Sequence, residues 1–216
     1  MAKEYRKAYR EGVYCGRPVP GFGDRGGRIP IVGLAPGAHC ANRTGRLFTG
    51  DSSGQFLYSA LHRVGIASRP DSRHSCGGME LRDAFLSVAC RCAPPANKPS
   101  REEQLACRSY LAREIALLPD LRVTLALGWI ALETVVQIDW ATNWAELQAR
   151  QPAAGNRTGM AFKHAAEYRL GAAAPWLVAS FHPSRQNTQT GRLTPAMCDE
   201  VWERARKLLG GGDAAG

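Results

Sequence analysis

The chain has 216 residues, of which 44% are hydrophobic and 22% are charged, so we expect one soluble globular domain over residues 1–209 and a disordered Gly-rich tail at 210–216. The 28 Lys and Arg residues against 19 Asp and Glu residues give a formal net charge of +9, which favours a polyanionic partner such as nucleic acid. The chain shows no secretory signal and no apolar run of membrane-spanning length, so we expect a cytoplasmic protein without a membrane partner.

Short, continuous apolar runs alternate with segments of helical periodicity along the chain. We expect four strands, at 28–34, 84–90, 122–127 and 176–181. A helix follows each strand. The first is capped by Ser52 or Ser53 and ends near Val64, and the second is opened by the Ser100–Glu103 capping box and ends near Leu118. The third runs from Gly128 to about Val136, and the fourth from Thr194 to about Leu209.

Strands that are apolar on both faces need helices on both sides of the sheet. The pattern therefore predicts an α/β fold, a three-layer α/β/α sandwich with a central, mainly parallel four-stranded sheet. In such folds ligands bind beyond the carboxyl ends of the strands. Three polar loops leave strand ends, after Leu34, Cys90 and Phe181, and we expect them to meet at one site.

The composition of each loop suits ligand binding, although each candidate residue also has a structural interpretation. The first loop is rich in glycine, which allows close approach of backbone to a ligand, and it carries neither a Walker A nor a dinucleotide-binding pattern. Asn97 in the second loop could read a base edge or satisfy its own loop. His182 in the third could act chemically or be a satisfied structural histidine. Phe48 could be an ordinary core residue, and Asp51 could be a helix N-cap.

Together the three loops resemble the motifs of the uracil-DNA glycosylase superfamily, and those of family 5 (B-type) in particular. The resemblance rests on GLAPGAH at 33–39, NRTGRLFTGD at 42–51, CAPPANKP at 92–99 and HPSRQNTQTGRLT at 182–194, and PVPGFGD at 18–24 is also similar. It runs from about Tyr14 to Leu209 and implies a three-layer α/β/α sandwich. It also implies a monofunctional enzyme that flips a deaminated base out of DNA and hydrolyses its N-glycosidic bond.

The resemblance further implies roles for individual residues. Phe48 would stack on the base, His182 would stabilise charge on the leaving base, Asp51 would orient water or stabilise the sugar cation, and Asn97 would contact the base or the water. Gly37, Ala38 and His39 would line the pocket, and Ser184, Arg185 and Gln186 would contact the DNA strand.

The turn Ala35-Pro36-Gly37-Ala38 has no polar side chain where other families of glycosylases carry Asp, Glu or Asn. The resemblance therefore implies a substrate range that extends beyond uracil, for example to hypoxanthine. We expect the enzyme to work as a monomer on DNA that contains such bases.

Family 5 also implies a structural [4Fe–4S] cluster on four cysteines, two of them in an N-terminal C-x-x-C. Cys92 and Cys107 match the other pair, but this sequence has no C-x-x-C, and we expect its N-terminus to be truncated. Cys15 is a weaker candidate for a replacement ligand. Cys40 stands where the family has Gly, and its side chain could crowd the pocket.

Two other functions remain open at this point. A DNA-binding relative that has lost catalysis would keep Arg185 and the basic surface, and an assay for abasic sites separates it from an enzyme. An α/β enzyme that acts on free nucleosides would need no basic groove, so the charge of +9 argues against it. Steeply salt-dependent binding to duplex DNA would favour a protein that acts on DNA over an enzyme that acts on free nucleosides.

Overall fold

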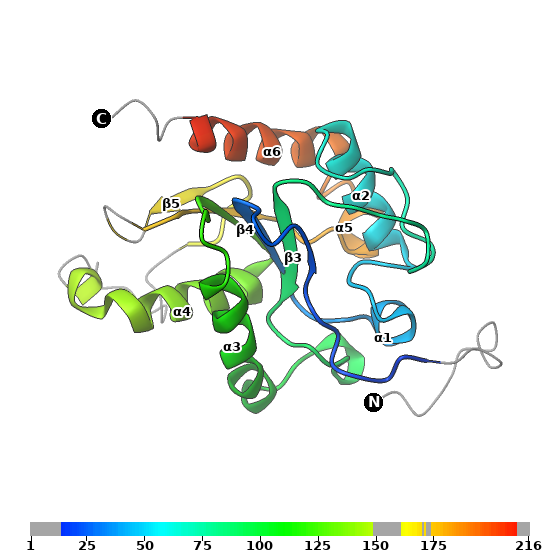
Figure 1. The fold of residues 1–216 in the computed structure, drawn as a ribbon, viewed down its shortest axis with the longest axis horizontal. Helices are drawn as coiled ribbons and strands as arrows, with labels where there is room; N and C mark the ends of the chain where they lie inside the picture. The colour runs from blue at the N-terminus through cyan, green and yellow to red at the C-terminus, as the bar shows by residue number, and fades with distance from the viewer. Residues whose placement is uncertain (1–13, 149–160, 170, 172–173, 211–216) are drawn as a thin grey trace.

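The computed structural model describes residues 14–148, 161–169, 171 and 174–210 (Figure 1). The strands are β1 (Phe22–Gly23), β2 (Ile29–Gly33), β3 (Ala84–Val88), β4 (Val123–Leu127), β5 (Glu167–Arg169) and β6 (Trp176–Ser180). The helices are α1 (Ala41–Thr44), α2 (Ser52–Arg63), the 3-10 helix η2 (Pro95–Asn97), α3 (Arg101–Ala116), α4 (Trp129–Gln148), α5 (Arg185–Gln189) and α6 (Pro195–Gly210). Gly210 ends α6, and the rest of the predicted tail lies outside the described residues.

The sheet has six strands in the order β1-β3-β2-β4-β6-β5. The four predicted strands form its parallel centre, β3-β2-β4-β6, in agreement with the expected α/β class. The prediction of four strands was nevertheless wrong, because β1 and β5 add one antiparallel strand at each edge. Both edge strands are only two or three residues long, which limits the unpaired backbone that the edges expose.

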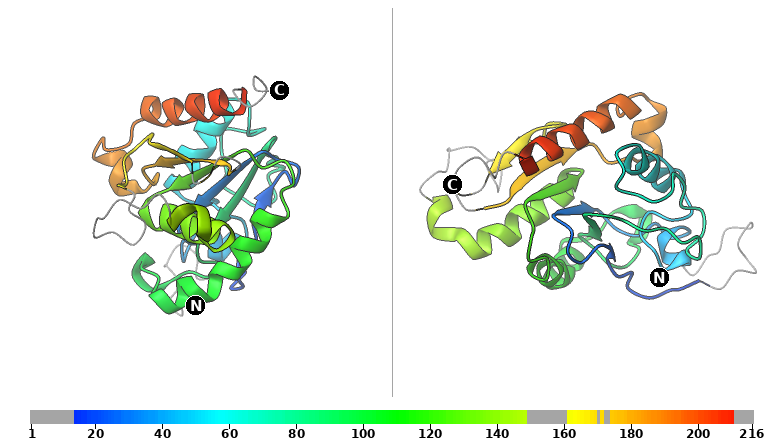
Figure 2. Two further views of the ribbon diagram at one scale, coloured as in Figure 1. Left: turned by 90° about the vertical axis from the view of Figure 1, so that its left-hand side faces the viewer. Right: turned by 45° about the horizontal axis from the view of Figure 1, so that its top comes forward.

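Helices cover both faces of this sheet, as Figures 1 and 2 show, with α2 and α6 on one side and α3 and α4 on the other. Two hydrophobic cores match the two faces. Ile31, Leu125 and Val178 pack on the side of α2 and α6. Val32 and Ala126, their neighbours along the strands, pack on the side of α4. Successive strand residues point to opposite faces, so the continuous apolar runs fill both layers.

The helix ends explain where the sequence prediction succeeded and where it failed. The capping box is present: Ser100 accepts from the Glu103 amide, and the Glu103 side chain accepts from the Ser100 amide. Thr194 caps α6 by accepting from the Met197 amide. The predicted end of α4 near Val136 was wrong, because that helix continues to Gln148. None of the described helices is both long and apolar enough to span a bilayer.

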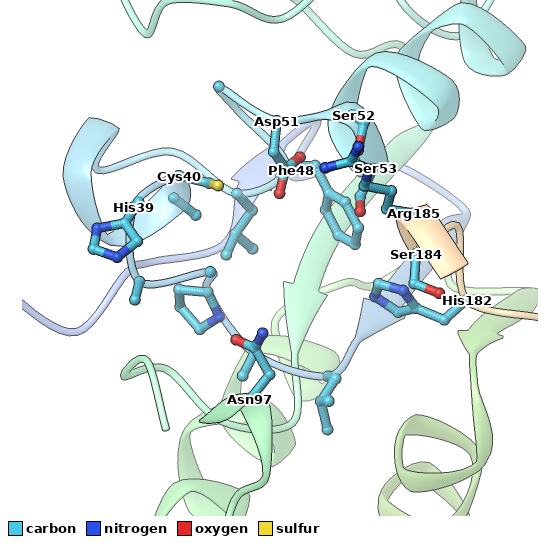
Figure 3. Close-up of a pocket in the computed structure, with 18 of the residues that line it drawn as sticks. His39, Cys40, Phe48, Asp51, Ser52, Ser53, Asn97, His182, Ser184 and Arg185 are labelled. Atoms are coloured by element: carbon cyan, nitrogen blue, oxygen red, sulfur yellow. The ribbon is translucent and has the colours of Figure 1, made fainter. Parts of the chain in front are cut away.

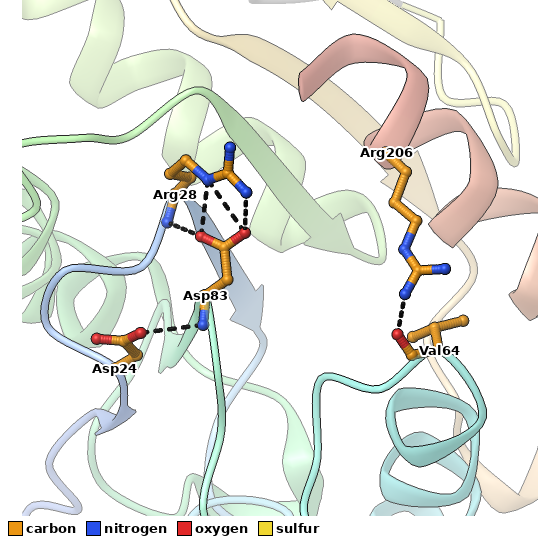
Figure 4. A network of polar contacts seen from close by, with 5 residues as sticks. All are labelled: Asp24, Arg28, Val64, Asp83 and Arg206. Atoms are coloured by element: carbon orange, nitrogen blue, oxygen red, sulfur yellow. Dashed lines mark hydrogen bonds and ion pairs between the residues drawn. The ribbon is translucent and has the colours of Figure 1, made fainter. Parts of the chain in front are cut away.

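Hydrogen bonds and an ion pair join the starts of β2 and β3, at the sheet edge opposite the three polar loops (Figure 4). The Arg28 guanidinium donates to both carboxylate oxygens of Asp83, at 2.6–3.1 Å, which links β2 to β3. Asp24 accepts from the Asp83 amide at 3.0 Å. Partial burial opposes ionisation, but the hydrogen bonds from Arg28 hold the pKa of Asp83 below its usual value. A separate hydrogen bond joins two helices: Arg206 of α6 donates to the Val64 carbonyl at the end of α2.

Glu114 of α3 joins three separate parts of the fold. Its carboxylate pairs with Arg91 and accepts from the Gly21 amide at 3.0 Å and from the Ser87 hydroxyl at 2.5 Å. We expect Glu114→Ala to lower the free energy of unfolding by about 2–4 kcal/mol, because it leaves a half-buried guanidinium without its carboxylate. Denaturant unfolding measures this loss, with Glu203→Ala on the exposed face of α6 as the control. A change in Glu114→Ala no larger than in that control would contradict this prediction.

Candidate active site

The loops after β2, β3 and β6 meet at one cavity of about 990 Å³, which confirms the expectation that they share a site. Every predicted site residue apart from the two cysteines lines this cavity: Gly37, Ala38, His39, Phe48, Asp51, Asn97, His182, Ser184, Arg185 and Gln186. Figure 3 shows Asp51 and Phe48 on one side of it, Asn97 on the opposite side and His182 beside Phe48. The geometry brings these residues together, while their chemical roles stay predictions.

Phe48 is held in an unusual conformation by two glycines. Its backbone lies in the left-handed region at φ 52°, which a bulky side chain rarely adopts. A Cβ on Gly33 would lie 2.9 Å from the Phe48 ring, and a Cβ on Gly54 would lie 1.8 Å from the Phe48 carbonyl oxygen. Both glycines therefore permit close packing that any side chain would prevent. The ring is only partly buried: it packs against the hydrophobic core and also lines the cavity.

Asp51 is the N-cap of α2, which corrects the prediction that Ser52 or Ser53 caps this helix. Its Oδ1 accepts from the Gly54 amide at 2.8 Å. Oδ2 lies on the side of the first loop, 3.7 Å from where a Cβ on Gly37 would be. One carboxylate oxygen thus holds the helix while the other faces the cavity, so the structural and chemical interpretations of Asp51 are compatible.

Asn97 projects from η2 toward the cavity, opposite Asp51 (Figure 3). Its backbone has φ 56°, and Ala96 before it has φ 51°, so two successive residues occupy the left-handed region. The carbonyls of Pro94 and Pro95 hold this turn by accepting from the amides of Asn97 and Lys98. The turn is therefore held by its backbone, and the exposed Asn97 side chain lines the cavity, where its amide can reach a ligand.

His182 lies where the chain leaves β6, and its ring centroid is 6.0 Å from that of Phe48 with 30° between the planes. The main chain is fixed here, because the His182 carbonyl accepts from the Ser184 amide at 2.7 Å and from the Asn187 side-chain amide at 2.9 Å. Burial lowers the pKa of His182 to about 4, and the Asp51 carboxylate offsets only part of this effect. At neutral pH the imidazole is therefore uncharged and can donate one N–H.

The low pKa of His182 predicts a pH-dependent stability. The pKa of His182 is near its ordinary value of 6.5 in the unfolded chain and about 4 in the folded chain. The free energy of unfolding is therefore highest, as far as this group is concerned, above pH 6.5, and it falls as the pH is lowered toward 4. We expect this one group to account for a loss of about 3 kcal/mol across that window. Urea unfolding at several pH values measures it, and the curve of a His182→Asn variant should be flatter there. Parallel curves for the two proteins would contradict the prediction.

The rim of the cavity comes from α1 and α5, two short helices in segments predicted to be loop. The Asn42 side-chain amide donates to the Ala38 carbonyl, and Arg43 Nε donates to the His39 carbonyl, which fixes the pocket wall. The His39 ring also contacts Tyr14, whose hydroxyl lies 2.9 Å from Nδ1. Cys40 lines the cavity too, as its place in the first motif suggested.

Ser184, Arg185 and Gln186 form the start of α5 rather than a loop. Ser184 is its N-cap and accepts from the Asn187 amide at 3.3 Å. Arg185 and Gln186 are both exposed and line the mouth of the cavity. A guanidinium and an amide there suit contacts to a strand of nucleic acid that enters the site.

Arg46 supports the turn that presents the site, and the sequence did not reveal it. It is only 8% exposed, and its guanidinium donates to four neutral acceptors, on Thr49, Ser72, His74 and Ser75. The guanidinium also lies 5.3 Å from the centre of the Phe22 ring. Arg46 therefore ties residues 72–75 to the turn that presents Phe48 and Asp51. Sequence spacing could not have shown this, because three of the four acceptors lie 26–29 residues away and two of them are backbone carbonyls.

The cysteines occupy separate places. Cys92 is exposed and Cys107 half-buried, and both lie near the buried Cys90, whose pKa is raised to about 12 first by burial and then by Cys107. Cys15 lies elsewhere, beside Arg43 and Cys76. Within the described residues, no three His, Cys, Asp or Glu side chains are arranged to hold a metal ion.

Comparison with known proteins gives consistent matches over nearly the whole chain. A family model described as the uracil DNA glycosylase superfamily matches residues 20–206. A type-5 uracil-DNA glycosylase of Thermus thermophilus is 47% identical over 205 residues, which are 95% of this chain and 86% of that protein. A type-5 uracil-DNA glycosylase of Pyrobaculum aerophilum is 41% identical over 199 residues, which are 92% of this chain and 80% of that protein. A type-4 enzyme of the same organism is 35% identical over 58% of this chain and 56% of its own.

Proposed function

Because the chain belongs to the uracil-DNA glycosylase superfamily, and within it is a type-5 uracil-DNA glycosylase, we propose that its pocket accepts hypoxanthine and other deaminated bases in DNA as well as uracil. The observation that carries this proposal is the composition of the pocket wall. Ala35, Pro36, Gly37 and Ala38 present no polar side chain to the base, and the cavity of about 990 Å³ has room for a purine. A wall without polar side chains discriminates only weakly between one base edge and another.

The arrangement of side chains supports a hydrolytic mechanism. Phe48 stacks on the flipped base, and Asn97 on the opposite side hydrogen-bonds to the base edge or to the water. The bond between C1′ and the base nitrogen breaks, and its electron pair leaves with the base. His182, as a neutral donor, stabilises the negative charge that develops on the base oxygen.

Asp51 acts on the sugar side of the same bond. Its carboxylate stabilises the positive charge at C1′ and orients the water whose hydroxyl joins that carbon. The other proton of this water passes through the carboxylate to the departing base or to solvent. Since water is the nucleophile, the step needs no covalent intermediate with the enzyme. Arg185 and Gln186 hold the DNA strand at the mouth of the cavity.

The described residues match half of the ligand set that a [4Fe–4S] cluster needs. Cys92 and Cys107 would supply two of its four thiolates, and the buried Cys90 lies near both. The cluster on Cys92 and Cys107, the monomeric state and the cytoplasmic location stay predictions, and iron and sulfide content with the visible absorbance tests the first of them.

The test of the proposed range uses labelled duplexes that differ in a single base: uracil, hypoxanthine, or thymine as the undamaged control. Single-turnover excision, detected as alkali-labile strand scission, should occur with uracil and with hypoxanthine and be absent with thymine. Cleavage of uracil alone would overturn the wider range while leaving the type-5 activity intact. Tight, salt-dependent binding without any cleavage would favour the DNA-binding relative instead.

A further inference from the structure

A histidine side chain outside the cavity lining forms hydrogen bonds at the end of β6. His164 precedes β5, and its Nδ1 accepts from the Phe181 amide at 3.1 Å, while its Nε2 lies 3.1 Å from the Met197 carbonyl oxygen of α6. Phe181 is the residue immediately before His182. The imidazole therefore bridges the start of α6 and the point where the chain turns into the active site.

The two contacts determine the state of the His164 ring. A backbone N–H can only donate, so Nδ1 must be unprotonated to accept from Phe181. A carbonyl oxygen can only accept, so Nε2 must carry the proton to donate to Met197. Only the neutral imidazole with its proton on Nε2 satisfies both partners at once.

The surrounding contacts hold this ring and Phe181 as one unit. The His164 and Phe181 rings stack with centroids 4.9 Å apart and 15° between planes, and the Arg192 guanidinium lies 4.8 Å from the Phe181 ring centre. Ala165 has φ 58°, a left-handed conformation, and its amide donates to the Ala179 carbonyl at 2.8 Å. A backbone conformation of this kind persists only where the surroundings determine it.

We propose that His164 is a positioning residue for the glycosylase reaction, which sets the place of the His182 imidazole by holding the Phe181 amide. The inference rests on the role proposed for His182. Ser184 and Asn187 fix the His182 carbonyl on one side, and His164 holds the N–H of the Ser180–Phe181 peptide on the other. Without the His164 bond that peptide is held on its carbonyl side, where Ser180 accepts from the Gly128 amide at 2.8 Å, but its N–H side loses its partner. A small displacement of a reacting group lowers the rate far more than it lowers binding.

Three substitutions separate the two hydrogen bonds. His164→Asn places an amide oxygen where Nδ1 lies and can keep the bond to Phe181, His164→Gln reaches only toward Met197, and His164→Leu makes neither bond. We expect single-turnover uracil excision to fall about tenfold or more in the Leu and Gln variants and to stay within about threefold of wild type in the Asn variant. Affinity for a duplex with an abasic-site analogue should change less than about twofold in all three.

A double-mutant cycle shows whether the effect passes through His182. In a His182→Ala background, His164→Leu should cause no further loss of rate, because the group that it positions is gone. His62→Leu, on the exposed face of α2, is the matched control. The proposal is overturned if the Asn and Leu variants lose rate equally, or if His164→Leu lowers the residual rate of His182→Ala by the same factor as in wild type. If His164→Leu does not fold, the Asn and Gln pair decides, and a wild-type protein that leaves uracil intact would refute the role of the site itself.

Discussion

Replacing His182 with alanine is expected to lower the single-turnover rate of uracil excision by about 100-fold or more, with little change in DNA affinity. Loss of one preorganised donor to a developing anion has an effect of this size in other enzymes. His182 stands at the cavity wall beside Phe48 as an uncharged imidazole, so it can stabilise charge on the leaving base without being titrated near neutral pH. The measurement is strand scission at saturating enzyme.

The control for this substitution is His62→Ala, because His62 is exposed on α2 and lies outside the cavity lining. If His182→Ala keeps more than about a third of the wild-type rate, then the electrostatic contribution assigned to its imidazole is wrong. A lower affinity at an unchanged maximal rate would instead identify His182 as a residue that binds substrate.

Asp51→Asn should separate the two functions of the carboxylate. Asparagine is as good an N-cap as aspartate, so the bond from the Gly54 amide and the melting temperature should be kept. The rate of excision should nevertheless fall about 100-fold, because a neutral amide neither stabilises the sugar cation nor accepts a proton from water. Excision kinetics and thermal unfolding of the same sample test both statements.

Two further variants complete the test of Asp51. Asp51→Ala should lose the rate and also about 1 kcal/mol of stability, since the cap is lost with the charge. Asp71→Asn, at an exposed position in the neighbouring loop, should change neither. An Asp51→Asn protein with normal excision would mean that this residue serves the helix alone.

The parts of the fold that depend on long local patterns were predictable. The four central strands are continuous apolar runs, and the capping box of α3 needs only Ser100 and Glu103. The edge strands β1 and β5 were missed because two or three residues carry no detectable period, and their pairing is set by β3 and β6. Asp51 rather than Ser52 caps α2, because it is the Asp51 carboxylate that accepts from the Gly54 amide, and the sequence offered three adjacent residues able to cap.

The cavity lining followed from order along the chain, since the ends of parallel strands meet at one edge. The residues that support the cavity did not. Arg46 acts partly and His164 wholly through backbone groups, and the partners of His164 are 17 and 33 residues away. Nothing in the spacing of two such residues distinguishes them from an ordinary surface arginine or histidine.

The left-handed backbone at Ala96 and Asn97 sets stability against activity in this loop. Ala96 is exposed, and glycine adopts φ 51° without the cost that a Cβ brings, so Ala96→Gly should raise the free energy of unfolding by about 1 kcal/mol. The same change loosens the turn that holds the Asn97 amide over the cavity. A variant chosen for heat resistance alone would therefore keep a substitution that lowers the rate of excision.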